Sequence, residues 1–145
     1  FKIAILRPPM VYGKGCKGNY PRLANLAKTT PIFPDIDNQR SMIYVDNLNE
    51  FVRLLIDDSV SGLFFPQNKE YVKTSEMVKL IAEFHGKKIK FTRFFNLLLK
   101  LINIDIVNKV FGDLIYEKDI SEYKKNYNIY DFIDSISLTE KETIN

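Results

Sequence analysis

The chain has 145 residues, of which 46% are hydrophobic and 27% charged, and its formal net charge is +3 at pH 7. This balance is typical of one globular domain and differs from that of disordered chains. Basic residues are interspersed with acidic ones, so the sequence builds no basic stripe and excludes a nucleic-acid-binding surface. The single cysteine, Cys16, excludes an internal disulfide framework and favours the cytoplasm. We expect no membrane span and no signal peptide, because no apolar run approaches about 20 residues and no basic leader is present.

Short strand and helix patterns alternate in the first half of the sequence. Residues 2–6 are apolar and β-branched and predict a buried strand, which Pro8 and Pro9 end. Helical spacing over 20–28 predicts a helix with a proline in its first turn, where proline is tolerated. Extended pieces are expected over 31–34, between prolines, and over 41–44.

The next segments continue the alternation. A helix is expected after Asp46, its predicted N-cap, with an apolar stripe formed by Leu48, Phe51, Val52, Leu55 and Ile56. Residues 62–65 and 89–92 predict strands. The helix between them is expected to start at a Thr74 or Ser75 cap, to end at Gly86 and to bury Met77, Leu80, Ile81 and Phe84.

Helical patterns dominate the last third of the sequence. Apolar faces over 94–102 and 107–115 predict two helices, and residues 130–142 predict a third. The first two carry much apolar surface for a small chain, so we expect them to cover a partner or a homodimer interface. The whole pattern predicts an α/β fold with short strands and a mostly helical later part.

Three features invite functional interpretations. The loop 13–18 satisfies G-x-G-x-x-G, but two prolines separate it from the preceding strand and no acidic residue follows at the expected distance. We therefore interpret it as a surface loop beside a ligand site and not as a dinucleotide-binding turn. His85 has no spaced co-ligands for a metal and is interpreted as a helix-end residue, and Cys16 lacks the partners of a nucleophile. The tyrosines over 116–132 are interrupted by acidic residues, which favours helix packing over base stacking.

Three motifs in order resemble the extended short-chain dehydrogenases that act on nucleotide sugars, the NAD-dependent epimerase/dehydratase family. Residues 6–13 (LRPPMVYG) are similar to the family's R-P-x-x-V-Y-G strand and turn. Residues 19–23 (NYPRL) with 31–33 (PIF), and then 39–48 (QRSMIYVDNL), follow at family spacing, and the tail after Lys118 resembles the family's last segment. The resemblance covers nearly the whole chain.

The resemblance implies the carboxyl-terminal portion of a Rossmann-like NAD(P)-binding fold. Residues 1–13 would be its last Rossmann-side strand and turn, and 14–145 a substrate-binding lobe. Pro8 and Pro9 would line the nicotinamide pocket of NAD, and Arg40 would fork onto the diphosphate of a UDP-sugar. The full set of substrate-binding residues implied by the resemblance is Met10, Asn19, Tyr20, Pro31, Phe33 and Arg40. Met10 departs from the asparagine of many relatives, which implies one hydrogen bond fewer to the sugar.

The catalytic machinery of the family is not visible in this sequence. None of the eight tyrosines has a lysine four residues on, so the family's Tyr-x-x-x-Lys acid/base pair has no counterpart, and no residue is assigned a catalytic role. The resemblance therefore implies a partner, the family's NAD-binding half. The implied function is the substrate-binding part of a UDP-glucose 4-epimerase-like enzyme, with polysaccharide synthesis as the family-level role. The alternatives are a 4-keto-sugar-nucleotide reductase and a non-catalytic nucleotide-binding module.

Overall fold

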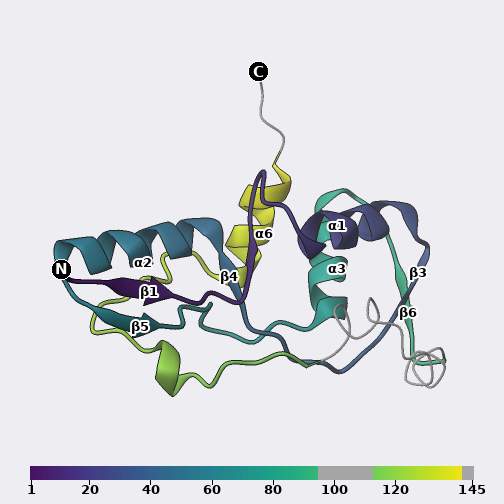
Figure 1. Cartoon of the computed structure of the whole chain (residues 1–145). Helices are drawn as coiled ribbons and strands as arrows, with labels where there is room; N and C mark the ends of the chain where they lie inside the picture. The colour runs from purple at the N-terminus through teal and green to yellow at the C-terminus, as the bar shows by residue number, and fades with distance from the viewer. Residues whose placement is uncertain (95–112, 142–145) are drawn as a thin grey trace.

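The computed structural model describes residues 1–94 and 113–141. The six described strands form three separate parallel pairs, β1–β5, β2–β4 and β3–β6, and helices pack around them (Figure 1). In chain order the elements are β1 (Ala4–Leu6), β2 (Met10–Tyr12), α1 (Asn19–Thr29), β3 (Ile32–Pro34), β4 (Met42–Tyr44), α2 (Val45–Asp57), β5 (Gly62–Phe64), α3 (Thr74–Phe84), β6 (Lys90–Thr92), the short 3₁₀ helix η1 (Asp119–Ser121) and α6 (Phe132–Glu140). The α/β class predicted from the sequence is confirmed, and so are the strands and helices expected outside 94–115.

The predicted helix starts were wrong at two places. The chain passes from β4 into α2 without a loop, so Tyr44 occupies the N-cap position and Asp46 lies in the first turn. Thr74 is the first residue of α3, and its backbone N–H donates to Asn38 Oδ1 at 3.0 Å. A side chain distant in sequence thus satisfies a donor that a local cap usually satisfies.

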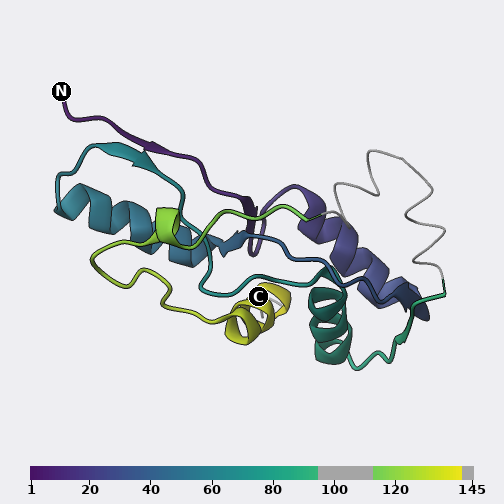
Figure 2. The same cartoon turned by 90° about the horizontal axis from the view of Figure 1, so that it is seen from below.

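The pair β2–β4 is a wall between two hydrophobic cores. Met42 and Tyr44 of β4 face the first core and Ile43 faces the second, because successive side chains of a strand point to opposite faces. On β2, Tyr12 and Val11 divide in the same way. The first core is enclosed by α1, α3 and α6, of which α3 packs on both others, and the second lies between α2 and the pair β1–β5 (Figures 1 and 2).

The strand β1 has an open outer side. Figure 2 shows β1 at the margin of the molecule, with β5 between it and the interior. Ile3 and Ile5 are 65% and 53% exposed, so the strand predicted to be buried is covered on one face only. The stripe predicted for α2 is likewise only partly buried. Phe51 and Leu55 lie in the second core, whereas Val52 and Ile56 are exposed. On α3, Met77 and Ile81 are buried as expected, but Phe84 is exposed.

A buried amide network joins the two cores. Asn68 donates to the hydroxyl of Tyr12 at 2.9 Å and accepts from the backbone N–H of Tyr44 and from Asn47 Nδ2. Asn47 also donates to the carbonyl of Tyr130, just before α6. Burial raises the pKa of Tyr12 to about 12, so its hydroxyl stays protonated and bonds Ser135 Oγ of α6 at 2.6 Å. These bonds fix β2, α2 and α6 relative to one another.

The predicted helices of the last third are only partly covered by the structure. Residues 95–112, which hold most of both apolar faces and the proposed homodimer surface, lie outside the described residues. Leu114 and Ile115 are not helical; Leu114 instead bridges to Arg40. Gly86 has the left-handed conformation predicted for it, with a φ of 66°. No helix among residues 1–94 and 113–141 has the length and apolar character needed to cross a membrane.

Candidate functional site

The proline pair lies where the chain crosses from β1 to β2. The backbone N–H of Arg7 donates to the carbonyl of Phe64 at 2.9 Å, which extends the β1–β5 ladder by one bond. Pro8 and Pro9, which have no N–H, end the ladder and are half-buried. Met10 opens β2, and its side chain packs against the first core. The assignment of Pro8 and Pro9 to a nicotinamide pocket stays a prediction.

Asn19 and Tyr20 are the first two residues of α1. The ring of Tyr20 is buried and stacks on Tyr12, with 5.6 Å between centroids and 16° between planes. Its hydroxyl donates to Glu140 Oε1 at 2.8 Å. Burial, and then this bond, raise the pKa of Tyr20 well above its usual value. The hydroxyl of Tyr20 is therefore used inside the molecule, whereas Asn19 is half-buried at the surface.

Phe33 is likewise an interior residue. It lies on β3, which pairs with β6, and its ring contacts Phe91 edge-on at 6.2 Å. Pro31 precedes the strand, is exposed and offers its carbonyl to the N–H of Lys90. Met10, Tyr20 and Phe33 thus all contact the first core, whereas Pro8, Pro9 and Arg40 lie outside it.

Arg40 is buried where three segments cross. Its backbone exchanges two hydrogen bonds with Val72, and the neighbouring Ser41 N–H donates to the carbonyl of Leu114. Burial lowers the pKa of the guanidinium, and the negative charge of Asp113 opposes that shift. Asp113 is itself fixed, because its Oδ1 accepts from the backbone N–H of Gln39 at 2.7 Å. The sequence pattern identified Arg40 but gave no sign of this acidic neighbour.

A cavity of about 470 Å³ lies between the glycine loop, α1 and the end of α6. Its lining includes three lysines and one carboxylate, and Tyr20 is the one predicted site residue that takes part; the full lining is Gly13, Lys14, Gly15, Cys16, Tyr20, Pro21, Ala24, Asn25, Lys28, Thr139, Glu140 and Lys141. The loop therefore borders a cavity, and its place beside a ligand site stays a prediction. In the described part of the chain, this cavity and the two below do not unite the residues that the resemblance implied.

Glu140 closes the floor of this cavity. Its side chain is 5% exposed and accepts from Tyr20, from His85 Nε2 at 2.6 Å and from Lys28 Nζ at 3.0 Å. Burial alone favours the protonated carboxyl, but the three donors outweigh it and lower the pKa of Glu140. His85 follows α3 as its C-cap, which confirms the helix-end interpretation. No group of side chains suited to a metal ion occurs within the described ranges.

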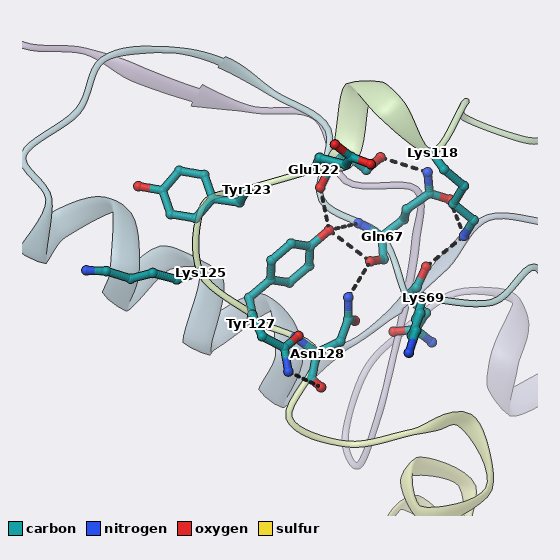
Figure 3. A pocket seen from close by; sticks show the side chains of 11 residues that line it. Gln67, Lys69, Lys118, Glu122, Tyr123, Lys125, Tyr127 and Asn128 are labelled. Atoms are coloured by element: carbon teal, nitrogen blue, oxygen red, sulfur yellow. Dashed lines mark hydrogen bonds between the residues drawn. The ribbon is translucent and has the colours of Figure 1, made fainter.

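A second cavity, of about 330 Å³, lies between the loop after β5 and the segment before α6. Figure 3 shows Tyr127 and Asn128 pointing toward Gln67, while Lys125 extends away from them. The hydroxyl of Tyr127 bonds the N–H and carbonyl of Gln67 and the carbonyl of Ser121. Lys118 donates to the carbonyl of Asn68 at 2.8 Å. The central polar groups bond one another, so this cavity is a structural junction.

A third cavity, of about 400 Å³, is an apolar groove between β1 and α2. Its lining comes from both elements and the turn after α2: Lys2, Ala4, Leu6, Val52, Leu55, Ile56, Ser59 and Val60. On β1 the groove is lined by Ala4 and Leu6, which alternate along the chain with the exposed Ile3 and Ile5.

Comparison with known proteins shows which sequences and structures this chain resembles. No known family model matches the chain. UDP-glucose 4-epimerase from Vibrio cholerae is 34% identical over 86 residues, which cover 56% of this chain and 26% of the epimerase. The structure of dTDP-4-dehydrorhamnose reductase from Bacillus anthracis, in complex with NADP, matches 63% of this chain and 34% of its own, with 25% identity and a TM-score of 0.54. UDP-N-acetylglucosamine 4-epimerase from Bacillus cereus matches 94% of this chain and 46% of its own, with a TM-score of 0.65 and 16% identity.

This chain has the fold of the extended short-chain dehydrogenases. The likeness to nucleotide-sugar epimerases and reductases agrees with the motif order found in the sequence. The chain spans only about a quarter of the curated epimerase and under half of either solved structure. The fold is thus shown for this chain over the portion that it shares with these proteins.

Sequence reasoning missed two acidic residues of this chain. Asp113 stands beside Arg40, and Glu140 gathers Tyr20, Lys28 and His85. Both sets of contacts join residues more than 50 positions apart, so no local sequence pattern predicts them. A solitary histidine at a helix end was the one available hint that a buried acid lies nearby.

Proposed function

We propose that this chain is the nucleotide-sugar-binding part of an NAD-dependent 4-epimerase acting on UDP-glucose or UDP-galactose. The observation that carries the proposal is its 34% identity to the Vibrio cholerae UDP-glucose 4-epimerase over 86 residues. Arg40, fixed through both backbone groups, is the residue proposed to bind the diphosphate, and its planar guanidinium suits phosphate oxygens. Asn19, half-buried at the start of α1, is proposed to bind the same ligand.

The test is calorimetric titration of UDP-glucose into the wild-type chain and into Arg40→Ala. The variant is expected to lose about 1.5–3 kcal/mol of binding free energy, the scale of a hydrogen bond to a charged group. Arg53→Ala is the matched control, because Arg53 forms exposed ion pairs within α2 only. Arg40→Lys keeps the positive charge but lacks the two parallel N–H donors of the guanidinium. It supplies a second measurement where the alanine variant does not fold. Equal affinity in wild type, Arg40→Lys and Arg40→Ala would remove Arg40 from the site.

A reductase of a 4-keto nucleotide sugar is the second candidate. It is favoured by the 25% identity to the dTDP-4-dehydrorhamnose reductase from Bacillus anthracis. Product analysis of a polypeptide carrying both the NAD-binding half and this chain separates the two reactions. Conversion of UDP-glucose to UDP-galactose supports the epimerase, and reduction of a 4-keto nucleotide sugar supports the reductase. Nucleotide binding with neither product supports a non-catalytic module.

We propose that this chain has no NAD pyrophosphate site of its own. An added Cβ at Gly13 would lie 2.4 Å from Val45 Cγ1, so this glycine serves the packing of the loop on α2. Pro8 and Pro9 offer at most an apolar wall for a nicotinamide ring. We therefore expect titration of NAD into this chain to give no measurable heat, and micromolar affinity would contradict that expectation.

The proposed partner of this chain is an NAD-binding α/β half. Parallel sheets are almost always covered on both faces, and a two-stranded sheet is marginal by itself. The pair β1–β5 is parallel, exposes Ile3, Ile5 and Leu63 and borders an apolar groove. A further parallel strand beside β1, with helices over the exposed face, would complete it. The length of the related proteins outside the matched portion, up to 74% of the curated epimerase, supports this choice of partner.

A further inference from the structure

The start of α1 lacks side-chain capping. Gly18 occupies the N-cap position, no side chain caps the first turn, and no acidic residue lies within it. A helix start of this kind leaves several backbone N–H groups without partners and usually frays. Yet Tyr20, the second residue of α1, is among the buried residues of the chain. Something outside the helix must therefore hold this end.

Glu140 provides the attachment. Its carboxylate binds Tyr20 at the start of α1 and Lys28 two turns later, at 2.8 Å and 3.0 Å. These two residues lie on one face of α1, so a single carboxylate fixes both the position and the rotation of the helix. His85, at the end of α3, holds the same carboxylate at 2.6 Å from the other side. Three helices, α1, α3 and α6, thus meet at one buried side chain.

The electrostatics favour a permanent attachment at neutral pH. The donors of Tyr20, Lys28 and His85 keep Glu140 ionised, and the raised pKa of Tyr20 keeps its hydroxyl protonated as a donor. Lys14 and Lys141 add positive charge nearby, and Lys14 Nζ donates to the carbonyl of Lys141 at 3.0 Å. Hydrogen bonds to an ionised acceptor are about twice as strong as those between neutral groups.

We propose that Glu140 is a positioning residue, which holds the start of α1 in the orientation that presents Asn19 to the nucleotide sugar. This inference rests on the proposed function and reassigns Tyr20: its hydroxyl acts through Glu140 and does not contact the ligand. The ring of Tyr20, stacked on Tyr12, fixes how deeply the start of α1 lies in the first core. The hydroxyl of Tyr20 fixes the rotation of α1 about its axis.

The test compares Tyr20→Phe with Tyr127→Phe. Each variant removes one buried hydroxyl and keeps the ring. Tyr20 belongs to α1 and bonds Glu140, whereas Tyr127 belongs to the second core and bonds Gln67 and Ser121. Amide hydrogen exchange of Asn19, Tyr20, Arg22 and Leu23, and the Kd for UDP-glucose, are measured in both; Pro21 has no amide hydrogen. Tyr20→Phe is expected to raise the exchange rate of these amides about tenfold and to raise the Kd for UDP-glucose about tenfold. Each change corresponds to the loss of one hydrogen bond to a charged group. Tyr127→Phe is expected to change neither, even where it lowers Tm.

Glu140→Gln supplies the second comparison. The amide keeps an oxygen for Tyr20 and loses the charge that holds Lys28, so its exchange rate at the start of α1 should lie between those of wild type and Tyr20→Phe. Unchanged exchange in Tyr20→Phe, or equal loss of binding in Tyr127→Phe, would overturn the positioning role. Absence of UDP-glucose binding by the wild type would instead reject the proposed function, and the exchange comparison would still decide the role of Glu140.

Discussion

At the scale of single residues, the glycine loop illustrates how one motif serves two unrelated demands. Gly13 is buried, has a φ of 148° and leaves no room for a Cβ against Val45. Gly15 has a φ of 77°, and an added Cβ there would meet nothing within 4 Å. The first glycine is required by packing and conformation together, the second by conformation alone. Packing and backbone conformation therefore account for these two glycines of the G-x-G-x-x-G match.

Alanine substitutions separate these demands. Gly13→Ala is expected to lower the free energy of unfolding by about 3 kcal/mol, because overpacking adds to an unfavourable φ. Gly15→Ala should lose only about 1 kcal/mol, the lower end of the strain of a left-handed residue. Urea titrations followed by circular dichroism measure both. Equal losses in the two variants would show that the contact with Val45 relaxes freely.

At the scale of elements, short segments are anchored by side chains from far along the chain. Asp58, just after α2, binds Tyr123 Oη at 2.7 Å and Lys125 Nζ at 2.6 Å, and it also pairs with Lys124. These bonds hold the segment between η1 and α6 against the end of α2. Lys125 contributes most and Tyr123 next to a pKa of Asp58 far below its usual value of 3.8.

The pH dependence of this anchor has a definite sign. A carboxyl whose pKa is lower in the folded state stabilises that state fully above its unfolded pKa, near 3.8, and loses the effect as pH falls through the folded value. Asp58→Asn is therefore expected to lower Tm at pH 7, and the difference from wild type should shrink as the pH falls below about 4. Asp57→Asn, one residue earlier in the exposed pair with Arg53, is the control with little effect. A difference that persists unchanged at pH 2 would contradict this account.

The elements themselves were largely predictable, and their junctions were not. Apolar alternation and helical spacing gave β1, β4, α1, α2 and α3, because these periods are local properties of the chain. The N-caps failed because β4 runs straight into α2 and because Asn38 takes the place of a local cap at Thr74. The candidate site divided similarly. Arg40 was predicted from its motif and stays a prediction, whereas its neighbour Asp113 and the contacts of Glu140 depend on the tertiary structure, which no local spacing encodes.

At the scale of the whole molecule, the chain has two different sides. Around α1, α3 and α6 the interior is enclosed, and hydrogen bonds between buried polar side chains connect these helices to one another and to β2. Around β1 the apolar surface is open, and Ile3, Ile5 and Leu63 are accessible. Sequence alone predicted a buried strand at 2–6, since β-branched runs are typical of covered strands. The strand is covered from one side in this chain, and the proposed partner would cover the other.

Lysine substitution at Ile5 tests that assignment. Ile5 and Ile129 are both 53% exposed, but only Ile5 lies on the proposed docking surface. In the chain described here, Ile5→Lys should leave Tm nearly unchanged. In a polypeptide that also carries the NAD-binding half, it should lower the free energy of unfolding by about 3 kcal/mol, because a charge is then buried without a partner.

Ile129→Lys is expected to be neutral in both settings and serves as the control. Thermal and urea unfolding are measured for Ile5→Lys and Ile129→Lys, each in this chain and in the longer polypeptide. A neutral Ile5→Lys in the longer polypeptide would show that the partner docks elsewhere.

The register of the strands also determines how the protein reaches its native state. Ala4 pairs with Gly62, Met10 with Met42 and Ile32 with Lys90, so no described sheet arises from a hairpin. Each pairing requires closure of a long loop, whose entropy is lost before any ladder bond compensates for it. Chains dominated by such distant contacts fold in milliseconds to seconds, whereas helices form within about a microsecond. We expect stopped-flow refolding to show early helical signal in α1, α2 and α3, followed by a slower step in which the strands pair.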